Sequence, residues 1–483
     1  MQYKTVLRMI GILLMLFSFT MWPPLLVSVY YGDSSPYPYM LSLIITFFSG
    51  LTLWLAWKNE EQDLKTRDGF LVVVLFWVVL SGFASIPMML ADKPHETLTD
   101  AVFETVSGFT TTGLSVVSNV DKLPHAMRYY RQQLEFLGGM GIIVLAVAIL
   151  PMLSVGGMQL IRAETPGPIK DSKLTPRITE TAKALWYIYS GLTLACALAY
   201  HFAGMSWFNA IGESFGTVST GGLAMHDNSF AYYQSSMIEW IAAFFMILGA
   251  TNFSLHFTAF RQFSLKAYRL DEEFTRYIAL LVIAIVIVAG VLIYKEVYPT
   301  WHLALTKAAF NVVSLATTTG AVSAQFHLWP SFIPVLLMLL AILGGCAAST
   351  GGGIKMIRGL LLFKQSRREM HRLIHPNAIM TIKFGKNVLP EPIIQAMWGF
   401  LGAFIALFLL LVLLLMADGL ALDSAFGATT AALANAGAAI GDVAEGMNTL
   451  PTTSKWILVF AMLAGRLEIF TLLVLFTPSF WRK

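Results

Sequence analysis

Long apolar stretches alternate with short polar segments along most of this chain. Ten of the stretches are long enough to span, or nearly span, the hydrocarbon core of a bilayer as helices rising about 1.5 Å per residue. They comprise residues Val6–Tyr30, Tyr39–Trp57, Phe70–Leu90, Gln132–Leu153, Ala184–Phe202, Ser236–Phe257, Tyr277–Tyr294, Phe332–Phe363, Ile393–Met416 and Lys455–Phe476. The pattern predicts an all-α polytopic membrane protein.

Four of the polar segments are similar to one another. Each follows an apolar, helix-like run and ends in a glycine, at Gly113, Gly222, Gly320 and Gly437. The spacing of these glycines leaves room in each unit for two spanning helices with a shorter helix between them. Unpaired backbone groups in hydrocarbon cost several kcal/mol each, so flexible polar segments are tolerated there where they line water or ions. We therefore predict four helix–pore-loop–helix repeats that enclose an ion channel.

The repeats divide the chain into six parts. Two N-terminal helices precede the first repeat, the third repeat has a broken second helix, and a basic cytoplasmic loop precedes the fourth repeat. In chain order these parts are residues 1–60, 69–160, 182–262, 274–365, 366–390 and 391–483.

Composition and charge support this class and exclude others. With 57% apolar and 12% charged residues, the chain is not a soluble globular protein. Most of the 32 Lys and Arg residues fall on one side if both termini are cytoplasmic, so the polar segments open to the outer side. The net charge of +4 reflects this bias, and nucleic acid is a poor candidate partner. Cys196 and Cys346 belong to no metal-binding or redox motif, and no catalytic motif is present, which argues against an enzyme.

Each repeat carries a candidate selectivity filter. In the first repeat a short helix from Asp100 to Phe109 would re-enter the membrane and direct its negative C-terminal end toward the pore, which favours a cation. The residues after it are poor helix formers whose carbonyl oxygens could replace a cation's hydration shell. Alignment on the glycines gives the candidate ion-binding residues Thr110, Thr111, Thr112 and Gly113; Ser219, Thr220, Gly221 and Gly222; Thr317, Thr318, Thr319 and Gly320; and Ala434, Asn435, Ala436 and Gly437. The alternative is that these small residues only pack helices closely.

Acidic residues accompany the candidate filters. Glu104 and Glu213 occupy equivalent positions in the first and second short helices. We favour a supporting role behind the filter over direct ion binding for both. Asp121 and Asp227 lie in the outer loops, where acidic side chains could attract cations or simply be solvated.

A break interrupts the long apolar run of the third repeat. It consists of Gly344, Gly345, Cys346, Ala347, Ala348, Ser349, Thr350, Gly351, Gly352 and Gly353. Helix propensity is low across these residues, and the predicted topology places them on the cytoplasmic side of the filter, where a loop could plug the pore. Arg466 lies inside the last apolar stretch, where a charge needs a partner, and we predict that it faces the pore and binds carbonyls of the break. The alternative is a structural tie between helices.

Together, several features resemble a known family. The four glycine-ended repeats, the run from Leu137 to Pro151, the GGCAASTGGGIK break and Arg466 are similar to the membrane subunit of bacterial Trk-type potassium uptake systems, in the Trk/Ktr/HKT superfamily. The resemblance covers essentially the whole chain. It implies four pore repeats in pseudo-fourfold order, a homodimer in the inner membrane, and cytoplasmic TrkA-like nucleotide-binding regulatory subunits.

The resemblance also implies roles for particular residues. It implies that potassium binds at the filter residues around the four glycines and that no covalent cofactor is present. It also implies that the break and Arg466 act together as a gate. A serine at the first filter glycine tends to accompany sodium transport in that superfamily, and this chain has Gly113 there. Asn435 and Ala436 depart from the pattern of the other three walls and put strict selectivity in doubt.

Potassium uptake without covalent chemistry is therefore the leading functional hypothesis. Uptake of sodium or another monovalent cation is the nearest alternative, and a membrane enzyme or scaffold is a more distant one. The sequence leaves open whether flux is passive or is coupled symport. The basic residues of 355–386 and 162–183 form a candidate docking surface for an acidic cytoplasmic partner, although membrane topology alone would also place them there.

Overall fold

The computed structural model describes residues 1–60, 65–94, 96–148, 178–330, 332–378, 380–385 and 387–482. The end of the fourth apolar stretch and most of the basic segment 162–183 lie outside these residues. The described chain is helical except for a short hairpin of β1 (Lys383–Phe384) and β2 (Asn387–Val388). The prediction of an all-α polytopic fold is confirmed.

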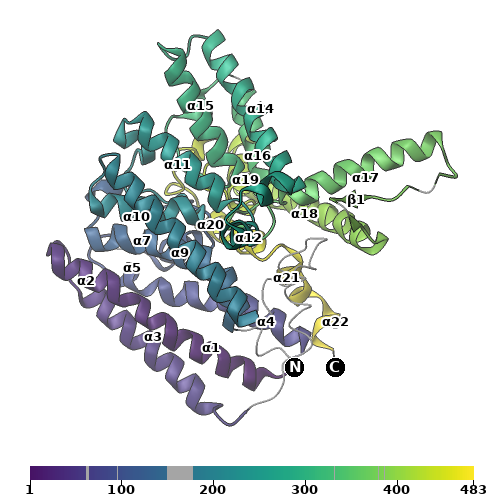
Figure 1. Ribbon diagram of the computed structural model, residues 1–483. Helices are drawn as coiled ribbons and strands as arrows, with labels where there is room; N and C mark the ends of the chain where they lie inside the picture. The colour runs from purple at the N-terminus through teal and green to yellow at the C-terminus, as the bar shows by residue number, and fades with distance from the viewer. Residues whose placement is uncertain are drawn as a thin grey trace.

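The N-terminal region forms two antiparallel arms (Figure 1). Helix α1 (Tyr3–Ser18) continues through a 3₁₀ turn into α2 (Trp22–Tyr31), and α3 (Tyr37–Ala56) returns alongside it. Gly11 and Gly50 face each other at the crossing. A Cβ atom built on Gly11 would lie 2.7 Å from the carbonyl oxygen of Gly50, so the two backbones touch without side chains between them.

The four repeats follow in chain order, each with a short helix between longer ones. The short helices are α6 (Leu98–Phe109), α10 (Trp207–Ser219), α15 (Trp301–Ala316) and α19 (Leu422–Leu433). The helices that precede them are α4 (Thr66–Ala84) with α5 (Ile86–Leu90), α9 (Ile178–Phe202), α14 (Glu272–Tyr294) and α18 (Glu391–Ala417). Those that follow are α7 (His125–Ala148), α11 (Ser236–Gly249) with α12 (Phe253–Gln262) and α13 (Lys266–Leu270), α16 (Ile333–Leu343) with α17 (Met356–Ile374), and α20 (Thr452–Arg466) with α21 (Phe470–Leu473) and α22 (Pro478–Trp481).

Two predicted stretches are not single straight spans. Among the described residues five helices are long and apolar enough to cross a bilayer, and two bent pairs raise that number to seven. The bent pairs are α11 with α12, at 96°, and α20 with the helical segment 470–476, at 110°. The expectation of continuous spans over Ser236–Phe257 and Lys455–Phe476 is therefore wrong. Neither bend contains a proline, although a glycine, Gly249 or Gly465, lies at each.

The basic segment before the fourth repeat is also more ordered than expected. Instead of a loop over 366–390, helix α17 continues to Ile374 and the hairpin follows. Figure 1 shows α17 and the start of α18 extending together from the rest of the molecule. Arg368 on this helix is 7% exposed and forms an ion pair with Glu391 at 2.8 Å, so it is not part of a solvent-facing positive surface.

Candidate ion pore

The four short helices lead into the candidate filters. They are 12 to 16 residues long, too short to cross the hydrocarbon core at about 1.5 Å per residue. Three begin with a side-chain cap, because Thr97, Ser206 and Thr300 each accept a hydrogen bond from a backbone N–H of the first turn. Their carbonyl-rich C-terminal ends lie at the candidate filter residues, where they favour a cation.

The backbone of the candidate filter is the same in all four repeats. In each, the N–H of the third filter residue donates to the carbonyl oxygen five residues earlier, at 2.8 Å. These bonds join Thr112 to Ser107, Gly221 to Gly216, Thr319 to Ser314, and Ala436 to Ala431. The altered side chains of the fourth repeat therefore leave its backbone geometry unchanged.

The second and fourth residues of each candidate filter have positive φ angles. The values are +50° at Thr111, +54° at Thr220, +59° at Thr318 and +51° at Asn435, and they range from +67° to +88° at the four glycines. A left-handed residue at every second position turns the intervening peptide planes over, an arrangement by which successive carbonyls can face one side. From the sequence, left-handed backbone was expected at the glycines but not at the threonines. This conformation costs roughly 1–2 kcal/mol at each threonine.

The four glycines form a closed ring. A Cβ atom added to any one of them would overlap a carbonyl oxygen of the next repeat. The overlaps run from Gly113 to Gly221, from Gly222 to Thr319, from Gly320 to Ala436, and from Gly437 to Thr112. The structure thus brings all sixteen candidate filter residues together around one axis and leaves no space there for side chains at the glycines.

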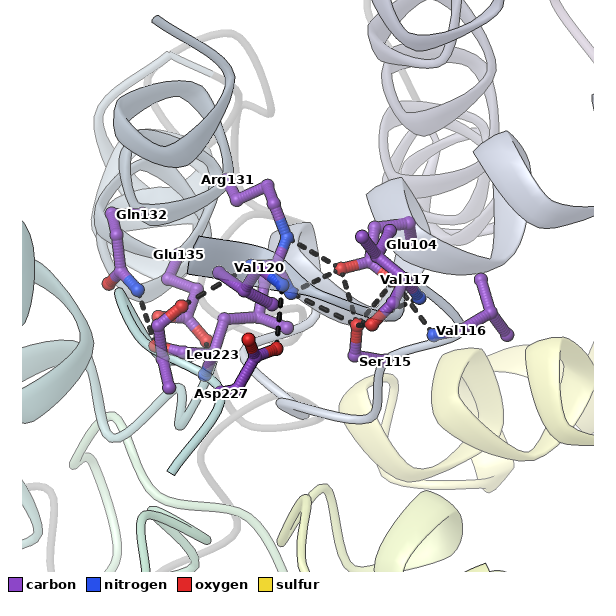
Figure 2. Close-up of polar contacts among 11 residues, drawn as sticks. Glu104, Ser115, Val116, Val117, Val120, Arg131, Gln132, Glu135, Leu223 and Asp227 are labelled. Atoms are coloured by element: carbon purple, nitrogen blue, oxygen red, sulfur yellow. Dashed lines mark hydrogen bonds and ion pairs between the residues drawn. The ribbon is translucent and has the colours of Figure 1, made fainter. Parts of the chain in front are cut away.

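The two carboxylates behind the ring contact protein groups. Glu104 is fully buried and pairs with Arg131 at 2.6 Å, and it accepts hydrogen bonds from the Ser115 hydroxyl and the Val116 N–H, both at 3.0 Å (Figure 2). Glu213 accepts from the Met225 N–H at 3.3 Å. Both carboxylates therefore hold the segment that follows the filter, which agrees with a supporting role.

The outer loops of the first two repeats are tied together. The carboxylate of Asp227 accepts from the Val120 N–H at 2.6 Å, as Figure 2 shows, and Asp121 lies 2.5 Å from His226 Nδ1. Burial raises the pKa of Asp121, but hydrogen bonds from His226 and Asp227 outweigh it and lower that pKa overall. These acids therefore make loop contacts and are not simply solvated.

Sequence reasoning missed the polar side chains at the start of α7. Arg131 donates to the Ala224 carbonyl oxygen at 3.2 Å, and Gln132 and Glu135 both bind Leu223 in the second repeat. Figure 2 shows these side chains between the two repeats. The one available signal was the run of polar residues at the beginning of an apolar stretch.

The break packs directly against residues of the ring. The Gly352 N–H donates to Thr318 Oγ1 at 2.6 Å, and Thr350 Oγ1 donates to the Gly249 carbonyl oxygen at 3.0 Å. Glu273 of α14 accepts from the Ala347 N–H inside the break at 2.8 Å and from the Ile357 N–H in the first turn of α17 at 3.0 Å. The break therefore contacts filter residues directly and is tied to α14.

Arg466 reaches the break as predicted. Its Nη1 donates to the Thr350 carbonyl oxygen at 2.9 Å and its Nη2 to the Gly138 carbonyl oxygen at 2.8 Å. The expectation that it lies mid-span is wrong, because α20 ends at Arg466, where the helix dipole favours a cation. A cavity of about 40 Å³ adjoins it and is lined by break residues, Asn435 and a second buried cation, Lys355, which the sequence analysis did not single out.

Comparison with known proteins places the chain in a family. A family model named TrkH and described as a cation transport protein matches residues 38–483. The chain belongs to the TrkH family. This is a family of transporters, so the chain is not an enzyme. Similar proteins named Trk system potassium uptake protein TrkH occur in Halomonas elongata, at 50% identity, and Escherichia coli K12, at 48%, with full coverage of both chains in each case. The crystal structure of the potassium transporter TrkH from Vibrio parahaemolyticus matches with a TM-score of 0.91 and 45% identity over the whole of both chains.

Asn435 provides a test of how the fourth wall is held. Its Nδ2 donates to Thr112 Oγ1 and to the Met462 carbonyl oxygen, both at 2.9 Å. We expect Asn435→Ala to lower the free energy of unfolding by about 3 kcal/mol, because it removes two buried hydrogen bonds and places alanine in a left-handed conformation. Asn435→Gly should cost less, since glycine tolerates that conformation. Thermal unfolding of the detergent-purified protein measures both.

Thr430→Val is the matched control for this prediction. The Thr430 side chain is fully buried in the helix that leads to Asn435, and its hydroxyl has no hydrogen-bond partner among the described residues. Equal melting temperatures for Asn435→Ala and Thr430→Val would show that Asn435 does not tie the fourth repeat to the first.

Proposed function

We propose that this protein takes up potassium across the bacterial inner membrane through a filter formed by residues 110–113, 219–222, 317–320 and 434–437. The observation that carries the proposal is the closed ring of four glycines, each preceded by the same hydrogen-bonded backbone turn. Rings of backbone carbonyls replace the hydration shell of potassium in known filters. The repeated backbone supports selectivity even where Asn435 and Ala436 replace threonines.

The break and Arg466 form the proposed gate. Thr350 and Gly352 are hydrogen-bonded to residues around the filter, and Arg466 is bonded to Thr350. The guanidinium, the Lys355 ammonium and the Glu468 carboxylate border the same small cavity. Glu468 is paired with Arg358, and the two cations at the cavity would repel an entering cation. Opening would require the break to leave the filter and the arginine to exchange its carbonyl partners.

Cytoplasmic termini, a second copy and a regulatory subunit complete the proposal. Relatives are named as parts of a Trk system, which supports an assembly of several components. Helix α17 is the proposed docking element for a cytoplasmic nucleotide-binding subunit. Its exposed Arg367 and Arg372 would attract an acidic partner, and the 85% exposed Leu373 offers apolar contact.

Cation flux into liposomes tests the proposed function. Purified protein reconstituted alone should conduct potassium in preference to sodium under equal gradients. Empty liposomes and liposomes with heat-denatured protein provide the background. Equal fluxes of the two ions would favour a nonselective monovalent cation transporter, and no flux above background under any gradient would contradict the proposal.

Gly113→Ser tests the filter assignment. A side chain at this position would overlap the carbonyl oxygen of Gly221 and strain a residue with a φ angle of +87°. We expect the potassium-to-sodium flux ratio to fall about tenfold, since a distorted ring fits potassium less well. Gly82→Ser is the control, because a Cβ at Gly82 meets no atom within 4 Å. An unchanged ratio in Gly113→Ser would remove the filter assignment.

Arg466→Ala tests the proposed gate. Loss of the charge and of the bond to Thr350 should raise basal potassium flux about five- to tenfold without a partner. A variant that combines Arg466→Ala with a shortened break should show a smaller increase in flux than the product of the two single increases. The reason is that both changes remove the same barrier. Arg368→Ala also deletes a buried arginine, one paired with Glu391, and should not change the flux. If Arg466→Ala folds and conducts no faster than the parent, Arg466 is a structural tie.

A further inference from the structure

The second repeat lacks two side chains that the first and third repeats have. In those repeats a hydroxyl pair stabilises the filter, with Thr110 and Thr112 2.7 Å apart and Thr317 and Thr319 2.8 Å apart. The second repeat has Gly221 at the position of Thr112 and Thr319. It also has Gly216 in its short helix, where the first and third repeats have Ser107 and Ser314.

Helix α7 fills the space that these glycines leave. A Cβ on Gly221 would lie 2.5 Å from Glu135 Oε1, and a Cβ on Gly216 would lie 2.8 Å from Glu135 Oε2 and 3.0 Å from Gln132 Oε1. Neither glycine has a positive φ angle, so backbone conformation does not require glycine at either position. Both positions are glycine because two side chains of the preceding repeat occupy the volume.

These two side chains hold Leu223, the residue after Gly222. Glu135 Oε1 accepts from the Leu223 N–H at 2.6 Å, and Gln132 Nε2 donates to the Leu223 carbonyl oxygen. The Leu223 N–H belongs to the same planar trans peptide as the Gly222 carbonyl, so the two groups point in opposite directions. By holding the N–H behind the filter, Glu135 directs the Gly222 carbonyl away from α7.

Within the part of the chain that the structure describes, no other repeat has this arrangement. Gly138, Gly249 and Gly465 contact the carbonyl oxygens of Phe109, Val218 and Leu433, each four residues before its filter glycine, so they mark equivalent points in three of the second helices. Six and three residues before these points, α7 has Gln132 and Glu135, whereas α11 has Ala243 and Met246 and α20 has Val459 and Met462. Gln132 and Glu135 are both fully buried. Burial of an amide and a carboxyl in a membrane protein is costly and is typical of groups with a functional role.

We propose that Gln132 and Glu135 are positioning residues for cation selection, which replace the missing filter hydroxyl of the second repeat and fix the direction of the Gly222 carbonyl. The proposal rests on the proposed function of the filter. It assigns to α7 a share of the selectivity that residues in the filter alone do not supply.

Gln132 and its neighbour Gln133 give a matched pair of variants. Gln133 is also buried in α7 and donates to a backbone carbonyl, that of Thr20 at 2.6 Å, away from the filter. In liposomes Gln132→Leu should lower the potassium-to-sodium flux ratio about fivefold, the effect of losing roughly one buried hydrogen bond. Gln133→Leu should lose similar thermal stability and keep the parental ratio. If leucine prevents folding, Gln132→Met has a similar unbranched shape and also cannot donate to Leu223.

Variants at Glu135 and Gly221 test the same idea independently. Glu135→Gln retains an acceptor for the Leu223 N–H and should keep the flux ratio, whereas Glu135→Ala should lower it. Gly221→Ala should disturb folding or flux in the parent but be tolerated together with Glu135→Ala, because the overlap is then relieved.

Two failures can be told apart in these measurements. Parental protein that conducts no potassium overturns the proposed function. Parental protein that selects potassium, together with Gln132 and Glu135→Ala variants that keep its flux ratio, overturns the inference alone.

Discussion

The rest of this structure depends on the contact between each filter glycine and the carbonyl oxygen of the next repeat. The four contacts form a closed cycle, so the position of every repeat depends on the other three. Because only backbone atoms meet there, the side chains of the filter are free to differ, and the fourth repeat keeps the common turn with Ala434, Asn435 and Ala436. The surrounding helices supply the polar groups that hold this backbone in place.

The sequence predicted the features that depend on local backbone chemistry. Glycines at equal positions, short helices too short to span, and a run of poor helix formers identified the repeats, the candidate filters and the break. Features that depend on contacts between residues far apart in the sequence were not predicted. Gln132 and Glu135 bind Leu223, some 90 residues along the chain, and Lys355 meets Arg466 at a cavity that exists only after folding. The bends of α11–α12 and of α20 contain no proline, and the glycines at them, Gly249 and Gly465, are not distinctive because glycine is common in transmembrane helices.

Two groups of buried charges near the filter have different environments. Behind the filter Glu104 and Arg131 neutralise each other at 2.6 Å, which satisfies both inside a membrane protein. Below the filter Arg466 and Lys355 donate to carbonyls of the break and border the same cavity. Carbonyl dipoles solvate a cation without cancelling its charge. The pair behind the ring is therefore neutral, while the cavity below the ring is bordered by two cations and by Glu468, whose carboxylate pairs with Arg358.

The asymmetry of the second repeat limits how this pore could have diverged from a single ancestral unit. Gly216 and Gly221 match the side chains of α7, which belongs to the repeat before them. A copy of the first repeat placed in the second position would bring Ser107 and Thr112 into the volume of Gln132 and Glu135. The four filter segments share one backbone conformation, but the repeats that carry them cannot be exchanged. The first and second repeats therefore fit each other in only one order along the chain.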